Sequence, residues 1–297
     1  MPSQSDLSTM FAEIFSIAFQ FADVFAFLIL AAAGLAIIFG MMGIINMAHG
    51  EFITCGIYVT VICVQNGVPL PLAQLFGALS AGLVGILLER TIIRHLYHRP
   101  LDSILATWGI SLMVTQGMLI VLGSSWQGIG TPLGSFAVGG YTFSTYRLVL
   151  FGAAVGVLVG LYLIYMRTNY GVMARATMQN ADMARALGVR TQRMYAISFG
   201  LGAALAGLCG ALYAPTMTLI PTMGITFIIE SFVTVVVGGA NVLMGTAPAG
   251  ILLGVVRTIL NAWYGQIAGQ IGLLITVIIV IRMLPEGVSG WLSRRGG

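Results

Sequence analysis

The chain has 297 residues, of which 58% are hydrophobic and only 7% are charged. Because soluble domains carry about 25% charged residues, and the mean hydropathy is +0.99, the composition excludes a large soluble core. The 13 basic residues are all arginine and the formal net charge is +4, which leaves too few charges for a nucleic-acid surface. We expect an all-α, polytopic membrane protein forming one transmembrane domain over residues 1–297.

Apolar runs of about 20 residues, the length of a membrane-spanning helix, recur along the whole chain. Residues 8–22 predict an extra interfacial helix. We then expect about eight spans, in the ranges 24–45, 51–66, 70–90, 102–122, 147–166, 195–217, 229–263 and 267–283, the range 229–263 being long enough for two. Glycine-rich stretches at 43–50 and 238–250 predict bent or broken helices. The Gly- and Ala-rich stretch 200–214 predicts close helix packing.

Arginine is concentrated in residues 90–101, in 167–194 and at the C-terminal end, whereas the loop 123–146 has no charge. The positive-inside rule therefore predicts that the arginine-rich segments are cytoplasmic, with the N-terminus outside and the C-terminus inside. The start of the chain carries Asp6 and Glu13 but no arginine, which is unlike a cleaved secretory signal. Arg257 interrupts an apolar run, and we expect it to face the protein interior or to snorkel to a membrane edge.

The segment "GIINMAHGEF", residues 43–52, places Asn46, His49 and Glu51 between two apolar runs. An ionisable group at membrane depth costs at least ~2.5–3.5 kcal/mol unless it meets a partner or water. One interpretation is a turn at the membrane interface. The other is a broken helix beside a water-filled path, which the neighbouring glycines favour because irregular backbone is tolerated there.

Four further residues are candidates for lining or gating a substrate path, although each is also typical of an ordinary helix contact: Thr107, Trp108, Glu230 and Asn241. The sequence has no catalytic constellation and no Cys/His metal-ligand spacing. The three cysteines are interpreted as small apolar residues rather than a disulfide or metal site. Because the chain has no lysine, it has no ordinary phosphate-binding P-loop, so any ATP must bind another subunit.

The most specific local pattern is "NADMARALG" in the arginine-rich loop 167–194. Asn180 is a good N-cap, Asp182 lies in the first turn, and Gly188 suits the left-handed position after a helix. A helix this short, about 10 Å long, is marginal alone in water. It would persist if it docked in a groove of a partner; the alternative is a frayed interhelical loop.

The segments "GMMGIINMAHGE" and "VVVGGANVLMGTAPAG" echo each other, since each combines a glycine-rich break with an asparagine, Asn46 or Asn241. Such an echo is typical of transporters built from two inverted repeats.

Three segments together resemble the LivH-type permease of ABC importers, a family that covers branched-chain amino acid and urea uptake. They are "GLAIIFGMMGIINMAHGEF", "YGVMARATMQNADMARALGV" and "VVVGGANVLMGTAPAGILLGVV", and the resemblance runs from about residue 30 to 290. Within the family, "RPLDSILATWG" resembles the urea permease subunit more than the amino acid subunit.

The resemblance implies a bacterial inner-membrane importer of several subunits. A periplasmic binding protein would deliver the substrate, a second related permease would pair with this chain, and two cytoplasmic ATPase subunits would hold the ATP. No cofactor belongs to this chain, its surroundings are membrane lipid, and nucleic acid is not a partner. The residues implied in ATPase coupling are Arg175, Asn180, Asp182, Ala184, Arg185 and Gly188. The Glu-Ala-Ala start of other coupling loops is replaced here by Asn180, Ala181 and Asp182.

Urea is small, neutral and polar, so its path needs hydrogen-bond donors and acceptors rather than a fixed charge pair. The buried polar set fits urea better than an amino acid zwitterion, and we expect a urea permease. The alternatives are the same importer for branched-chain amino acids or short amides, a passive channel, and an intramembrane enzyme. A channel needs no docking loop, and an enzyme would need a nucleophile or metal set at depth, which the sequence lacks.

Overall fold

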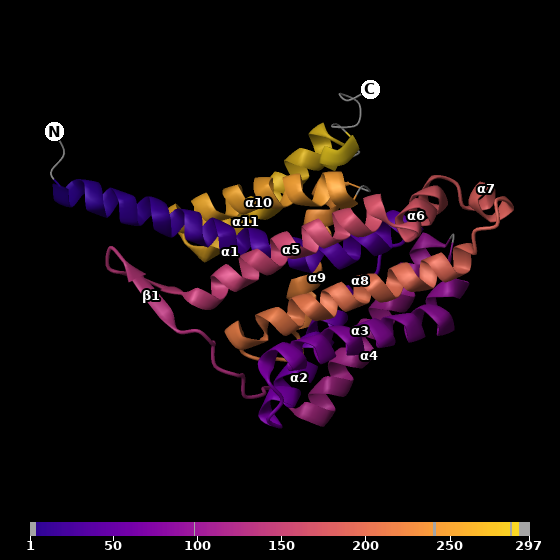
Figure 1. Cartoon of the computed structure of the whole chain (residues 1–297), viewed down its shortest axis with the longest axis horizontal. Helices are drawn as coiled ribbons and strands as arrows, with labels where there is room; N and C mark the ends of the chain where they lie inside the picture. Colours follow the sequence, from indigo (N-terminus) through magenta and orange to yellow (C-terminus); the bar gives the residue numbers. More distant parts are fainter. Residues whose placement is uncertain (1–3, 98, 240–241, 286, 291–297) are drawn as a thin grey trace.

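The computed structural model describes residues 4–97, 99–239, 242–285 and 287–290 and is almost entirely helical (Figure 1). Its helices are α1 Gln4–Met42, α2 His49–Gln65, α3 Leu70–Thr91, α4 Pro100–Leu122, α5 Thr145–Arg167, α6 Asn169–Gln179, α7 Ala181–Ala186, α8 Thr191–Tyr213, α9 Met223–Gly238, α10 Val242–Tyr264 and α11 Gln266–Met283. In the described part of the chain, seven helices are long and apolar enough to cross a membrane. The predicted all-α polytopic class is confirmed, and every predicted span range contains a helix.

The first helix differs from the sequence-based expectation. Residues 8–22 do not form a separate interfacial helix, because α1 runs without a break from Gln4 to Met42. The sequence has no glycine or proline between Gln4 and Gly34, so nothing in it ends the helix between the polar start and the apolar run. The break predicted at 238–250 is shorter than expected. Helix α9 ends at Gly238, and α10 is already helical from Val242 through Pro248.

The uncharged loop 123–146 contains a β-hairpin that the sequence analysis did not predict. Strands β1 Ser135–Val138 and β2 Tyr141–Ser144 pair antiparallel. Gly139 and Gly140 form the two-residue turn with φ of +56° and +87°, the conformation that a tight hairpin requires and that glycine adopts without strain. The hairpin lies against the first half of α1, where the Phe19 and Phe143 rings are 4.8 Å apart.

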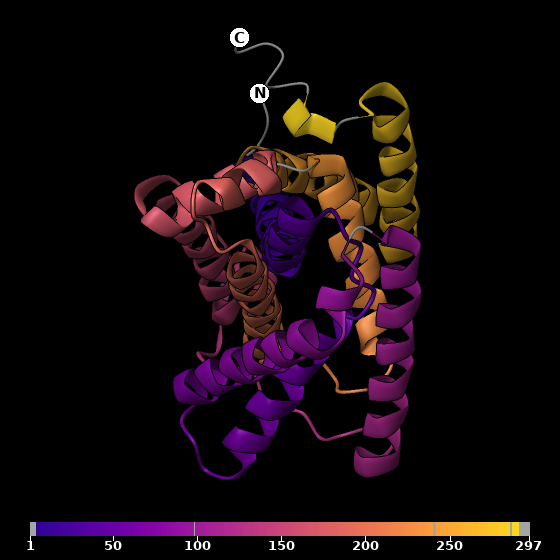
Figure 2. The ribbon, with the colours of Figure 1, turned by 90° about the vertical axis from the view of Figure 1, so that its right-hand side faces the viewer.

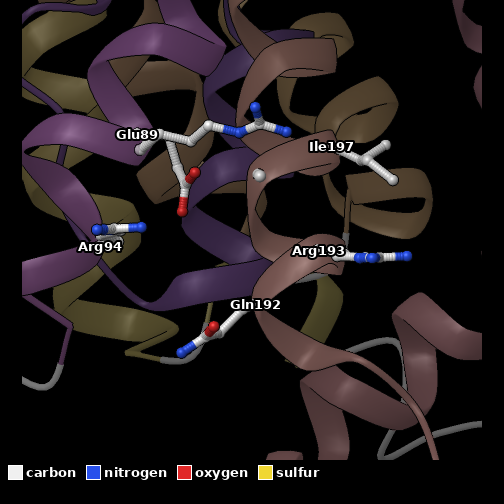
Figure 3. Close-up of a pocket in the computed structure, with 7 residues that line it drawn as sticks. Glu89, Arg94, Gln192, Arg193 and Ile197 are labelled. Atoms are coloured by element: carbon white, nitrogen blue, oxygen red, sulfur yellow. The ribbon is translucent and has the colours of Figure 1, made fainter.

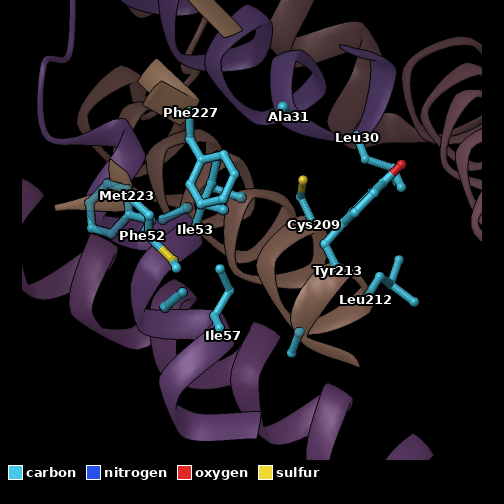
Figure 4. Close-up of a cluster of buried hydrophobic side chains, with 14 of the residues drawn as sticks. Leu30, Ala31, Phe52, Ile53, Ile57, Cys209, Leu212, Tyr213, Met223 and Phe227 are labelled. Atoms are coloured by element: carbon cyan, nitrogen blue, oxygen red, sulfur yellow. The ribbon is translucent and has the colours of Figure 1, made fainter. Parts of the chain in front are cut away.

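Helix α8 lies at the centre of the bundle and packs against α1, α2 and α3 (Figure 2). Its small residues allow backbones to touch: a Cβ added at Gly34 of α1 would lie 2.1 Å from the carbonyl oxygen of Gly202. The expectation of close packing along 200–214 is thus confirmed. Figure 4 shows the core beside this contact, where α2, α8 and α9 contribute Ile53, Cys209 and Phe227.

The two ends of the bundle differ in character. The start of α1 and the hairpin lie at one end, and α6 and α7 lie at the other (Figure 1). The two arginine-rich internal segments meet at the α6–α7 end, since Arg94 and Arg193 line one pocket. All internal arginine-rich sequence is therefore gathered at one end of the helices, as the charge distribution predicted.

Candidate functional site

The connection between α1 and α2 folds back into the helix bundle. After Met42 the chain turns at Gly43, where φ is +65°, and α2 starts at His49. The His49 Nε2 atom lies 3.0 Å from the carbonyl oxygen of Ala31, a residue about 16 Å back from the end of α1 at 1.5 Å rise per residue. Helix α2 therefore begins inside the bundle, and the segment is a broken-helix junction rather than an interfacial turn.

This junction buries all three polar side chains singled out in the sequence. Asn46 and His49 are fully buried, and Glu51 is 4% exposed. The Asn46 Oδ1 atom accepts a hydrogen bond from the Ala48 N–H at 3.1 Å, which holds the irregular backbone before α2.

A row of hydroxyl groups on α4 faces the junction. Thr107 Oγ1 accepts a hydrogen bond from the Met47 N–H at 3.0 Å. Ser111 and Thr115 both donate to Glu51 Oε1, at 2.8 and 3.0 Å. Because these residues are four apart, they lie on one face of α4, and that face fixes α4 to the junction.

The first turns of α2 and α9 touch at the junction. A Cβ added at Gly50 would lie 2.0 Å from the Gly224 carbonyl oxygen, and one added at Gly224 would lie 2.7 Å from Glu51 Oε1. The Glu51 carboxylate thus sits against the first turn of α9, where the helix dipole favours a negative charge. This placement and the two hydroxyl donors compensate a carboxylate that forms no ion pair within the described residues.

Three polar atoms of the junction have no hydrogen-bond partner within the described chain: Asn46 Nδ2, His49 Nδ1 and Glu51 Oε2. A buried polar group without a partner costs about 1–3 kcal/mol. One donor, one ring nitrogen and one carboxylate oxygen of the junction are therefore left unpaired in the described chain. An uncharged solute with both donors and acceptors matches this set.

The remaining predicted path residues occupy different places. Thr107 belongs to the junction, but the neighbouring Trp108 is 53% exposed on the other side of α4. Asn241 lies outside the described residues. Ser111 and Thr115 were not identified from the sequence, although their four-residue spacing from Thr107 was a usable signal.

Glu230 is engaged elsewhere on α9. Its Oε2 atom accepts from Arg257 Nη1 at 2.8 Å, and both side chains are nearly buried. Arg257 therefore faces the protein interior, one of the two placements expected from the sequence. Removing one partner of a buried pair strands the other charge, so Glu230 has a structural reason to be present.

The predicted coupling segment 167–194 contains two helices, α6 and α7, instead of one. Asn180 caps α7, with its side chain accepting from the Met183 N–H at 2.9 Å. Gly188 follows α7 with φ of +89°. The caps expected from the sequence are confirmed, so the segment is not a frayed loop.

Side chains of the coupling segment fall into two groups. Arg175 donates to the Tyr165 carbonyl oxygen and so fastens α6 to the end of α5, and Ala184 is buried. Asp182 and Arg185 form an exposed ion pair of 3.4 Å. Two exposed apolar side chains were not predicted: Met183 in α7 is 59% exposed and Leu187, directly after it, is 78% exposed.

Among the described residues, no group of three His, Cys, Asp or Glu side chains is arranged to hold a metal ion. The architecture is a bundle of membrane-spanning helices with a buried polar junction at a broken helix and a capped helix pair projecting from one end. This combination defines a membrane transport subunit.

Comparison with known proteins places the chain within this class. It belongs to the family described as the branched-chain amino acid transport system / permease component, whose model matches residues 17–284. A permease component is a transport subunit, not an enzyme; it carries no cofactor of its own, and ATP is used by partner ATPases.

Individual relatives are similar over most of their length. The chain is 27% identical over 278 residues to the high-affinity branched-chain amino acid permease BraD of Pseudomonas aeruginosa, covering 88% of this chain and 91% of BraD. It is 24% identical over 280 residues to LivH of Escherichia coli, covering 88% and 90% of the two chains. It is 27% identical over 288 residues to a probable LivH of Methanocaldococcus jannaschii, covering 89% and 88%. No solved structure matches.

Proposed function

We propose that this chain is the permease subunit of an ATP-driven importer whose cargo is urea. The observation that carries the proposal is the α1–α2 junction, where Asn46 Nδ2, His49 Nδ1 and Glu51 Oε2 have no partner in the described chain. Urea offers one carbonyl acceptor and four N–H donors, so it can pair with an amide donor and a carboxylate acceptor at the same time.

The charges around the junction favour a neutral cargo. An amino acid would bring a carboxylate as well as an ammonium group. Arg257 is already paired with Glu230, and the first turn of α9 is faced by the Glu51 carboxylate. A second carboxylate at this place would meet Glu51 without a guanidinium to compensate it.

Transport would couple the junction to ATPase subunits through α6 and α7. The exposed Met183 and Leu187 side chains would form an apolar surface that docks in a groove of one ATPase subunit. Tyr170 of α6 hydrogen-bonds Ser198 of α8 at 2.7 Å, so a displacement of α7 is passed to the central helix. A substrate-binding protein would deliver cargo at the hairpin end, and a second related permease would complete the membrane path.

A second cargo, a branched-chain amino acid, is favoured by the relatives' names, since BraD and LivH are branched-chain amino acid permeases. The discriminating experiment reconstitutes the chain with its partner permease, ATPases and binding protein and measures labelled urea uptake with and without excess leucine. We expect ATP-dependent urea uptake that leucine does not reduce. Leucine entry without urea entry would show that the cargo is an amino acid. Uptake without ATP would indicate a channel.

A further inference from the structure

A basic pocket lies where α3 and α8 reach the α6–α7 end of the bundle. Its volume is about 530 Å³, and its lining includes Arg90 from the end of α3, Arg94 from the short 3-10 turn Ile93–His95 that follows it, and Arg193 from the start of α8. Figure 3 shows Arg94 and Arg193 on either side of the Glu89 carboxylate. The junction lies elsewhere in the fold, so the transport site does not account for this pocket.

The three arginines are exposed and have no ion-pair partner in the described part of the chain. The one acidic residue in the lining, Glu89, accepts a hydrogen bond from the Tyr97 hydroxyl instead. Burial, reinforced by Glu89, raises the pKa of Tyr97, so that hydroxyl keeps its proton and remains a donor. With three guanidinium groups against one carboxylate, the pocket has an excess of positive charge and needs an anion.

The face of α3 that carries Arg90 continues as apolar surface, and Ile197 adds one exposed apolar side chain on α8. On α3, Leu83 and Leu87 precede Arg90 by seven and three residues, and they are 68% and 61% exposed. On α8, the exposed Ile197 follows Arg193 by four residues. Residues at these spacings share one side of a helix, so α3 presents arginine at its end and apolar side chains deeper in the membrane.

We propose that this pocket binds the phosphate headgroup of an anionic phospholipid, with its acyl chains lying along the apolar face of α3 beside Ile197 of α8. Guanidinium groups bind phosphate oxygens through charge-assisted hydrogen bonds. Basic pockets between membrane-spanning helices take such headgroups. A free phosphate would use the arginines but not the adjoining apolar face, which is why the lipid is the occupant that fits. The proposal holds whichever cargo the permease moves.

The test is native mass spectrometry of the full chain in detergent, titrated with phosphatidylglycerol or phosphatidylcholine. Each basic residue near a membrane surface contributes about 1 kcal/mol to binding of anionic lipid, or roughly fivefold in affinity. The triple variant R90Q/R94Q/R193Q should therefore bind phosphatidylglycerol about ten- to a hundredfold more weakly. The triple variant R99Q/R167Q/R282Q removes three exposed arginines outside the pocket and should lose less than a third as much affinity, on a logarithmic scale, as the pocket variant.

A variant that is expected to raise the affinity for phosphatidylglycerol separates an effect on lipid binding from an effect on the stability of the fold. Glu89→Gln removes the negative charge from the pocket and keeps an oxygen that accepts from Tyr97. It should bind phosphatidylglycerol severalfold more tightly, which a damaged fold would not do. Phosphatidylcholine binding should not change in any variant.

Three results would overturn the proposal. One is equal phosphatidylglycerol binding by the pocket variant and the wild type. Another is complete displacement of the lipid by inorganic phosphate at equal concentration, which would assign the pocket to small phosphate anions. The third is loss of the ATPase subunits from the purified complex of the pocket variant with lipid binding intact, which would assign the arginines to the ATPase interface.

Discussion

Glu51 is the residue at which a structural role and a transport role can be separated. Its Oε1 atom accepts from Ser111 and Thr115, whereas Oε2 has no partner in the described chain. Replacement by glutamine keeps an oxygen for the two hydroxyl groups and turns the free acceptor into a donor. Assembly of the variant therefore tests the structural role of Oε1, and uptake by the variant tests the transport role of Oε2.

We expect Glu51→Gln to assemble with its partners at the wild-type level and to reduce urea uptake per complex about tenfold or more, as the loss of a charged hydrogen bond predicts. The measurement is ATP-dependent uptake normalised to purified complex. Glu13→Gln, at an exposed acidic residue of α1, is the control and should leave uptake unchanged. Unreduced uptake would remove Glu51 from the path, and lost assembly would make its role structural.

At the scale of elements, the residues of α7 and its ends divide into those that hold the helix in place and those exposed for a partner. Asn180 and Gly188 define its ends, and Ala184 is buried, so substitutions there act on the helix itself. Leu187 is exposed and makes up much of the apolar surface, so a substitution at this position acts on a partner.

We expect Leu187→Asp to leave the chain inserted and folded but to uncouple ATP hydrolysis from uptake, because a carboxylate would be desolvated in the ATPase groove. The assay compares ATPase activity stimulated by binding protein with uptake in the same proteoliposomes. Leu101→Asp, at a comparably exposed leucine in the first turn of α4, is the matched control. Normal coupling in Leu187→Asp would place the ATPase contact outside α7.

The elements that the sequence predicted well are those whose signal is local. Apolar runs predict the spans, and the Asn180 and Gly188 caps predict α7. The hairpin had a local signal as well, the Gly139–Gly140 pair between β-forming residues, which the analysis of the uncharged loop did not use. The merger of 8–22 into α1 depends on the absence of a helix stop, which is a weak signal.

The contacts that define the junction were beyond sequence reasoning for a physical reason. Glu51 meets Ser111 and Thr115 across sequence separations of 60 and 64 residues. These contacts depend on how far α4 is shifted along its axis and how it is rotated toward α2. No local pattern encodes that register, because a four-residue hydroxyl spacing on a helix fits many partners.

For the whole molecule, the charge distribution and the fold together predict an orientation. Arginines from two internal segments gather at the α6–α7 end. The hairpin, whose loop has no charge, lies at the other end against α1. The positive-inside rule then places α7 in the cytoplasm, and the hairpin and the start of α1 outside. Contact between α7 and cytoplasmic ATPases needs the same orientation. The charge argument and the ATPase assignment are therefore tested by one experiment.

Thiol labelling of intact cells tests this orientation. In a background with Cys55, Cys63 and Cys209 replaced by alanine, Tyr141→Cys introduces a thiol at the exposed hairpin and Leu187→Cys introduces one at α7. A membrane-impermeant maleimide should label Tyr141→Cys in intact cells, and Leu187→Cys only in inverted vesicles. The cysteine-free background is the control and should not be labelled from either side. The reverse pattern would show that the chain has the opposite orientation in the membrane. Helix α7 would then face away from any ATPase that uses cytoplasmic ATP.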